Sequence, residues 1–417
     1  MRKLLKASLA SLIVLSACRA PSSSGDSSSS YNTKTSFPPI TDTEKVKSDS
    51  KIVLANNKFG AKIFTEILKT DKDKNIFISP TSILFALSMT YNGAKANTKT
   101  EMEKALELTG MTTEEVNKGA NALIRTLVNA DSNVRLDIAN SLWGKKNVKF
   151  SPDFLKNNED FFKATTSNID FNSEAVKMIN TWVSNATQGK IPTIIDGQID
   201  PNTLLFLINA IYFKGDWTNK FDKNLTKEED FNLVSGSKKK VQMMSLYEKL
   251  AYYKGDNFQS LSLPYGKENI SMYVFLPDND LEDFYKQLYD SNLTEWFGKF
   301  SKKNGTLKLP KFKLEYEKTL NEILGSLGMS TAFTENADFS AMFTDNTKAA
   351  ITNVKHKTFV EVNEEGTEAA AVTGVTVGAT SVMIDEPYNM VFDKPFFYMI
   401  RDNSSGTILF MGEVVEP

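Results

Sequence analysis

The chain has 417 residues, of which 41% are hydrophobic and 24% are charged, so it is long enough to bury a large core. A formal net charge of −2 gives no global basic field, and we expect no nucleic-acid partner. The single cysteine excludes an internal disulfide framework.

The N-terminal segment is predicted to be an export signal rather than part of the fold. Three positive residues precede an apolar stretch at 7–15, which is too short to span a bilayer. The following Leu-Ser-Ala-Cys at 15–18 resembles the lipobox of bacterial lipoproteins, which are cut before the cysteine and acylated on its thiol. This resemblance implies a signal peptide at 1–17, a lipid on Cys18 and anchoring to a membrane of the bacterial cell envelope. The outer membrane or the cell surface is one option for the location of the anchored protein. Plain secretion with cleavage after Ala17 is the alternative.

The Ser-rich stretch that follows is predicted to be a tether. Such a composition cannot bury enough apolar surface to order itself. We assign residues 18–50 to the lipidated cysteine and tether. Residues 51–417 show no second linker and no repeat, and they are expected to form one domain.

Helical periodicity dominates the first half of this domain. Residues 53–68 place Leu54, Phe59, Ile63 and Ile67 near one face. Further helices are predicted at 81–91, 98–108, 117–128, 173–187 and 318–327. Strands are predicted at 135–143, 203–213, 270–276, 306–314, 359–362, 388–392, 396–400 and 407–415. Helices early and strands late favour an α+β fold with helices packed on mainly antiparallel sheets.

The sequence offers little for catalysis. A Ser-His-Asp triad needs an imidazole base, and the only histidine, His356, lies in a predicted strand. Histidine and cysteine are too scarce for a zinc site. The adjacent Glu364 and Glu365 are expected to be solvated, as is the basic run Lys238-Lys239-Lys240. We therefore predict no enzyme, no metal and no cofactor.

One segment after the predicted 359–362 strand is unusual. Residues 364–383 begin at an acidic bend marked by Gly366 and continue with small or β-branched residues, none of them charged after Glu368. Read with period two, one face carries only small side chains: Thr367, Ala369, Ala371, Thr373, Val375 and Val377. Such a segment fits either an exposed loop or a new strand within a sheet. A plain buried strand is the alternative.

Five segments in order resemble the serpin family over about residues 51–417. They are Asn75-Ile76-Phe77-Ile78-Ser79-Pro80, Thr187-Gln188-Gly189-Lys190-Ile191, Asn209-Ala210-Ile211-Tyr212-Phe213, Glu364-Glu365-Gly366-Thr367-Glu368-Ala369-Ala370-Ala371 and Phe392-Asp393-Lys394-Pro395-Phe396. The resemblance implies an α+β, serpin-like fold of about eight to nine helices around three mainly antiparallel sheets, with an exposed reactive-centre loop.

The resemblance also implies a mechanism. A serine protease attacks the loop and forms an acyl-enzyme, and the cut loop inserts into the central sheet and traps the protease covalently. We expect such an irreversible suicide-substrate inhibitor to be a monomer. The hinge of inhibitory members matches Glu364, Glu365, Gly366, Thr367, Glu368, Ala369, Ala370 and Ala371. The residues that gate the sheet match Ser79, Ser82, Asn209 and His356, with Trp217 at its top.

The scissile bond is expected near the end of the loop. The family distance from Gly366 gives Thr380-Ser381, whereas counting back from the C-terminal signature gives Val382, Met383 or Ile384. With no Arg or Lys between Glu368 and Pro387, elastase-, subtilisin- or chymotrypsin-like targets are favoured. Papain-like cysteine proteases stay open as targets. The alternative function is a non-inhibitory serpin acting as a carrier or surface binding module.

Overall fold

The computed structural model describes residues 40–290, 293–367 and 386–417. The predicted signal peptide, Cys18 and most of the tether lie outside the described residues. The same holds for hinge residues Glu368, Ala369, Ala370 and Ala371 and for the scissile-bond candidates Thr380, Ser381, Val382, Met383 and Ile384.

The described residues contain nine α-helices in chain order. They are α1 (Lys51–Thr70), α2 (Pro80–Tyr91), α3 (Ala96–Ala105), α4 (Thr113–Val128), α5 (Pro152–Phe162), α6 (Ser173–Ala186), α7 (Leu281–Asp290), α8 (Leu293–Gly298) and α9 (Asn321–Leu324). Among these residues, no helix is both long and apolar enough to cross a bilayer.

A six-stranded sheet has the order β10-β11-β12-β4-β2-β3. Its strands are β2 (Val134–Lys145), β3 (Thr165–Ile169), β4 (Leu205–Asp216), β10 (Phe312–Thr319), β11 (Lys355–Val362) and β12 (Gly366–Thr367). All pairs are antiparallel except β2 with β3. Because β12 is antiparallel to both β11 and β4, those two long strands run parallel to each other.

The other strands form one hydrogen-bonded network of nine strands. They are β1 (Ile76–Ile78), β5 (Lys227–Asn232), β6 (Lys238–Lys254), β7 (Phe258–Tyr265), β8 (Ile270–Pro277), β9 (Ser301–Pro310), β13 (Tyr388–Val391), β14 (Phe396–Asp402) and β15 (Ile408–Val414). The 17-residue β6 pairs with β5 along its first part, with β9 from Met243 to Tyr252, and with β7 at its end. It therefore joins strands that could otherwise form two sheets.

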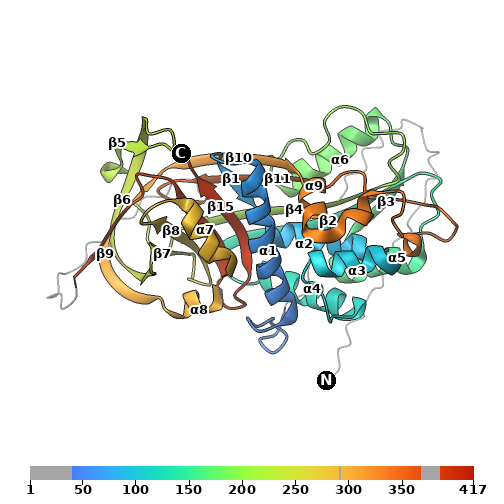
Figure 1. Cartoon of the computed structure of the whole chain (residues 1–417), viewed down its shortest axis with the longest axis horizontal. Helices are drawn as coiled ribbons and strands as arrows, with labels where there is room; N and C mark the ends of the chain where they lie inside the picture. Colours follow the sequence, from blue (N-terminus) through green and yellow to red (C-terminus); the bar gives the residue numbers. More distant parts are fainter. Residues whose placement is uncertain (1–39, 291–292, 368–385) are drawn as a thin grey trace, which may run out of the picture. The chain divides into compact units, whose positions relative to one another are not determined.

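Helix α2 positions the site because it lies between the two sheets, touching both β4 and β15. Ser79 caps its N-terminus by accepting a hydrogen bond from the Ser82 backbone N–H, and Pro80 occupies the first helical position, where no N–H is needed. Eleven of its twelve residues are buried. In Figure 1, α1 lies alongside β1 and β15, and α6 lies near β4.

Several predictions of local structure need correction. Leu54 faces solvent with 49% exposure, whereas Phe59, Ile63 and Ile67 are buried as expected. The predicted strand at 306–314 is two strands, β9 and β10, that meet next to Pro310, which cannot donate to a ladder. The predicted 318–327 helix is shorter, because its first residues belong to β10.

The basic run Lys238-Lys239-Lys240 lies in a strand. It opens β6, and Lys238 and Lys240 bind Asp230 on the neighbouring β5.

Candidate functional site

The central feature of the six-stranded sheet is an opening between β4 and β11, which we call the slit. In the described part of the chain, the two strands are bridged only at one end, by the two residues of β12. Below that bridge, a cavity of about 740 Å³ is lined by both strands and by α2. The slit therefore has the length and the free edges to accept a further antiparallel strand.

Gly366 and Thr367 begin such a strand. Gly366 pairs with Asp216, and Thr367 lies between Gly215 of β4 and Val362 of β11. A Cβ at position 366 would lie 2.1 Å from the Gly215 carbonyl oxygen, so this register requires glycine. The Thr367 hydroxyl is hydrogen-bonded to the buried Tyr265 hydroxyl at 2.7 Å.

Trp217 closes the top of the slit, as the resemblance implies. Its ring stacks on Tyr265 with centroids 4.4 Å apart, and its indole N–H donates to the Asn363 carbonyl at 2.9 Å. Its backbone N–H donates to the Glu365 carbonyl. The tryptophan thus holds the chain that leads from β11 into β12.

Glu364 and Glu365 are buried rather than solvated, contrary to the prediction. Glu365 binds Lys220 and Lys223 at 2.8 and 2.9 Å, while Glu364 binds Lys311 and accepts from Thr226. The hydrogen bond from Lys220 is the main cause that lowers the pKa of Glu365. Burial alone would raise the pKa of Glu364, but its hydrogen bonds and Lys311 outweigh burial and lower that pKa.

The predicted polar cluster forms only in part. The Ser79 N–H donates to His356 Nε2 at 3.1 Å, and the Ser79 Oγ accepts the Ser82 backbone N–H at 3.2 Å. Asn209 instead donates to Asn140 Oδ1 on β2 at 2.7 Å. The Asn209 Oδ1 atom is buried without a hydrogen-bond partner and belongs to the cavity wall.

His356 is buried and neutral, since desolvation lowers the pKa of its imidazole to about 3. Because Nε2 accepts a hydrogen bond, the ring carries its proton on Nδ1. No described cluster of three or more His, Cys, Asp or Glu side chains could hold a metal ion. His356 thus makes a buried polar contact beneath the sheet.

Sequence reasoning missed several residues of this site. Tyr265 comes from a different sheet, and Lys220, Lys223 and Lys311 come from connections whose partners only the fold reveals. Asn140 faces Asn209 across the β2–β4 ladder, a pairing that depends on the register.

The comparisons with known proteins agree with this geometry. The chain matches the profile described as Serpin (serine protease inhibitor) over residues 54–417. It is 39% identical over 386 residues to a leukocyte elastase inhibitor of Homo sapiens, covering 87% of this chain and 98% of that protein.

Solved structures of the same fold include the thermophilic serpin tengpin in its native state. It has a TM-score of 0.80 and 34% identity, covering 91% of this chain and 97% of tengpin. A complex of thyroxine-binding globulin with thyroxine has a TM-score of 0.78 and 30% identity, covering 88% of this chain and 99% of that one. The chain folded around this slit is therefore a member of the serpin family.

Proposed function

We propose that this chain is a monomeric, irreversible inhibitor of serine proteases that acts by cleavage of its loop and insertion of that loop into the slit. The main supporting observation is β12, which pairs with both β4 and β11 above a cavity that is lined by the same two strands. Each further residue added to β12 would gain backbone hydrogen bonds of roughly 0.5–1.5 kcal/mol each. Cleavage of the loop would release it for this purpose.

The register of β12 fixes which loop side chains would face inward. Thr367 lies opposite Val362 and Gly215, and both neighbours are buried. Continuing antiparallel, each step forward in the loop moves one residue back along β4 and β11. Ala369 would then face the core beside Val360 and Phe213.

Two steps further, Ala371 would lie between Thr358 and Ile211. Thr373 would lie between His356 and Asn209. Its hydroxyl could donate to the Asn209 Oδ1 atom, which has no partner in the present structure. Insertion would thereby satisfy a buried polar group that the uninserted state leaves unpaired.

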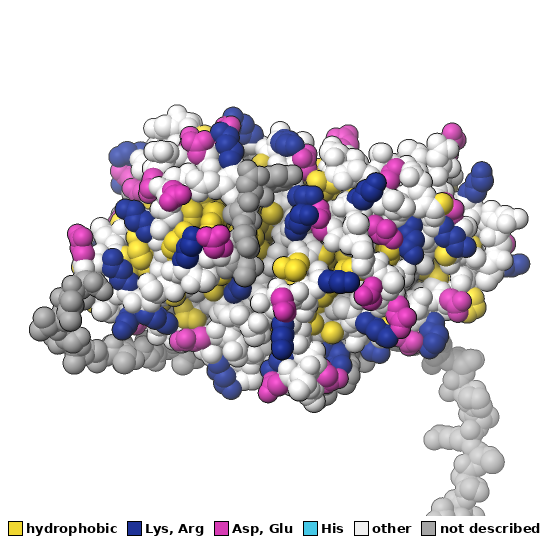
Figure 2. Space-filling view, turned by 60° about the horizontal axis from the view of Figure 1, so that its bottom comes forward, with side chains coloured by type: hydrophobic (Ala, Val, Ile, Leu, Met, Phe, Trp, Pro, Cys, Tyr) yellow, Lys and Arg dark blue, Asp and Glu magenta, His cyan; other side chains and the backbone are white. Residues whose placement is uncertain are grey.

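The expected targets are proteases that accept uncharged residues at the cut. Thr380, Val382 and Met383 suit elastase-, subtilisin- or chymotrypsin-like pockets, and the similarity to a leukocyte elastase inhibitor supports the first of these. On the face shown in Figure 2, acidic and basic side chains are interspersed. Because neither charge dominates this face, a target protease is expected to recognise the loop rather than a uniformly charged surface.

Incubation with elastase should give a covalent complex that survives SDS. Ala371→Glu, which puts a charge on the inward face, should convert the inhibitor into a cleaved substrate. Val372→Glu is the matched control, because the same charge would lie on the outer face and should leave the complex intact. Cleavage by every protease tried without any complex would overturn the proposal.

A carrier function is the competing proposal, because thyroxine-binding globulin shares the fold. It predicts cleavage without a complex and no gain in heat stability after cleavage. An inhibitor whose loop inserts should instead become markedly more heat-stable once cleaved, since the inserted strand completes the sheet. Melting curves of intact and cleaved protein separate the two functions.

We also propose that the mature protein is held on a membrane of the bacterial cell envelope through acylated Cys18. The supporting observation is the Leu-Ser-Ala-Cys sequence at 15–18 after an apolar stretch, which places the only cysteine at the acylation position. Cells expressing the chain should incorporate radiolabelled palmitate into it, and Cys18→Ser should abolish the label. Equal labelling of the variant would contradict the anchor.

A further inference from the structure

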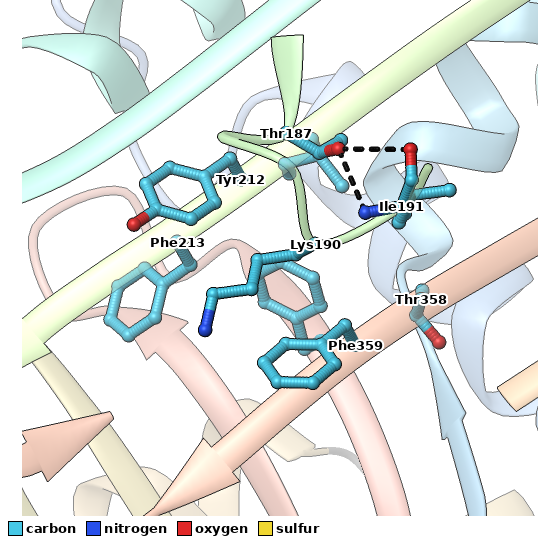
Figure 3. A pocket seen from close by; sticks show the side chains of 9 residues that line it. Thr187, Lys190, Ile191, Tyr212, Phe213, Thr358 and Phe359 are labelled. Atoms are coloured by element: carbon cyan, nitrogen blue, oxygen red, sulfur yellow. Dashed lines mark hydrogen bonds between the residues drawn. The ribbon is translucent and has the colours of Figure 1, made fainter. Parts of the chain in front are cut away.

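The connection that follows α6 crosses the slit close below β12. Figure 3 shows Lys190 reaching from this connection into the space between Tyr212 of β4 and Phe359 of β11. Its ammonium lies 4.6 Å from the centre of the Phe359 ring, within the range of a cation–π contact. The lysine thus lies between the two strands that a new strand would have to enter.

The backbone of this connection holds Lys190 in place. The buried Thr187 hydroxyl accepts the Ile191 N–H at 3.0 Å and donates to the Val183 carbonyl, so the turn is tied to α6. Gln188 and Gly189 both have positive φ, which reverses the chain after the helix. The position of the lysine is therefore set by the end of α6.

A separate small pocket lies beside Lys190. The pocket there has a volume of about 10 Å³, room for about one water molecule, compared with about 740 Å³ farther down. Its lining includes both inward-facing residues, such as Ile211, and outward-facing ones, such as Phe359. The narrow pocket therefore passes between the strands at the level of Lys190.

We propose that Lys190 is a stop that sets the rate at which the loop enters the slit. This inference rests on the proposed function. In the continued register, residue 370 would lie between Tyr212 and Phe359 on the outer face, where the lysine now lies. The Lys190 side chain must leave Phe359 before the third residue beyond Thr367 can pair.

Lys313 provides a matched control on the same ring. Its ammonium lies 5.5 Å from the centre of Phe359, but it comes from β10, on the side of β11 away from the slit. It makes the same kind of contact without standing in the path of insertion. Lys190→Ala should therefore change the insertion rate, and Lys313→Ala should not.

The readout is the rate at which intact full-length protein loses inhibitory activity on heating, as its uncleaved loop inserts. Lys190→Ala should raise this rate by about 2- to 30-fold, the factor that corresponds to loss of one cation–π contact. It should leave the melting temperature of the cleaved form unchanged, because the contact is already broken there. Lys190→Arg, which keeps the cation on the ring, should restore the slow rate.

Equal rates of activity loss on heating for Lys190→Ala, Lys313→Ala and the parent chain would overturn the proposed role of Lys190. So would a fall in the melting temperature of the cleaved form that matches the fall in the intact form, since that indicates a general structural role. If the parent chain neither traps elastase nor gains heat stability on cleavage, the proposed inhibitory function has failed instead. The two failures are thus distinct.

Discussion

The hydroxyl groups of Tyr265 and Thr367 lie 2.7 Å apart, and both side chains are buried. Tyr265 ends β7 of the nine-stranded network, and Thr367 ends the described part of β12 in the six-stranded sheet. One hydrogen bond therefore links β12 to the opposite sheet. Trp217, stacked on the tyrosine ring, completes the contact.

Tyr265→Phe should destabilise the protein without preventing inhibition. It removes one buried hydrogen bond, worth about 0.5–1.5 kcal/mol, but keeps the ring that stacks on Trp217. The midpoint of chemical denaturation should fall accordingly, and the SDS-stable complex should still form. In a double-mutant cycle with Thr367→Val, the two losses should not add. Additive losses would contradict the bond.

Gly366→Ala should abolish inhibition. The new methyl group would collide with the Gly215 carbonyl oxygen and with the backbone of Asp216, so β12 could not keep its register. Elastase should cleave the variant fully, and SDS gels should show no complex. Gly298→Ala is a suitable control because an added Cβ meets nothing within 4 Å there, and it should inhibit normally.

Glu365→Gln should destabilise the hinge at neutral pH. The variant loses the charge that binds Lys220 and Lys223, a loss of about 1 kcal/mol because both lysines are partly exposed. Thermal unfolding at pH 7 measures this difference. Glu174→Gln, which breaks an exposed ion pair with Lys177, should change nothing measurable.

The stabilisation that Glu365 gives to the folded chain should depend on pH in a defined way. The pKa of Glu365 is lower in the folded chain than in the unfolded one, with the hydrogen bond from Lys220 as the main cause. Its stabilisation is thus complete above the unfolded pKa of about 4.3 and is lost as pH falls through the lower folded value. Parent and Glu365→Gln melting temperatures should converge in strong acid. A constant difference down to pH 2 would contradict the ion pair.

His356 should stay neutral well into the acid range. Desolvation lowers the pKa of its ring to about 3, below the usual value of about 6.5. The unfolded chain therefore binds a proton that the folded chain does not, and this residue costs the fold stability as pH falls from about 6.5 to 3. As the only histidine in the chain, it gives one unambiguous imidazole signal by NMR. Titration of that signal near pH 6.5 would contradict the burial.

Replacing the histidine should act on the sheet rather than on catalysis. His356→Ala leaves the Ser79 N–H without its acceptor beneath the slit. We expect faster loss of inhibitory activity on heating and no change in peptide hydrolysis. A peptidase activity that requires His356 would overturn the gating role.

Much of the fold was predictable because long periodic segments are buried on one face. Along β11, which contains His356, buried and half-buried residues alternate. Strand β4 covers most of the apolar run at 203–213 that was predicted to be a strand. Leu54 fails because helical geometry places it on the side of α1 opposite to the buried Phe59 and Ile63. The strands β5 and β6 carry many charged residues, which obscure the alternation of apolar and polar positions, and they gave no clear signal.

The sequence predicts a hinge and a small-residue face, but it does not predict the contacts that hold Glu364 and Glu365. Glu364 and Glu365 look like surface acids until the fold brings lysines to them. The Asn209–Asn140 contact depends on strand register, which residue types alone do not determine. The expected grouping of Asn209 with His356 fails for that reason.

The close approach of Gly366 to Gly215 has a consequence for how this chain can vary. It fixes the register of β12 against β4. If the loop continues this strand, its odd-numbered and even-numbered residues would face opposite sides of the sheet. In the proposed mechanism, substitutions near the cut change the target protease without changing this register. Adding or deleting a single residue between 367 and 377 would exchange the two faces of the incoming strand. Loop length before the cut is therefore the property that natural variation should preserve most strictly.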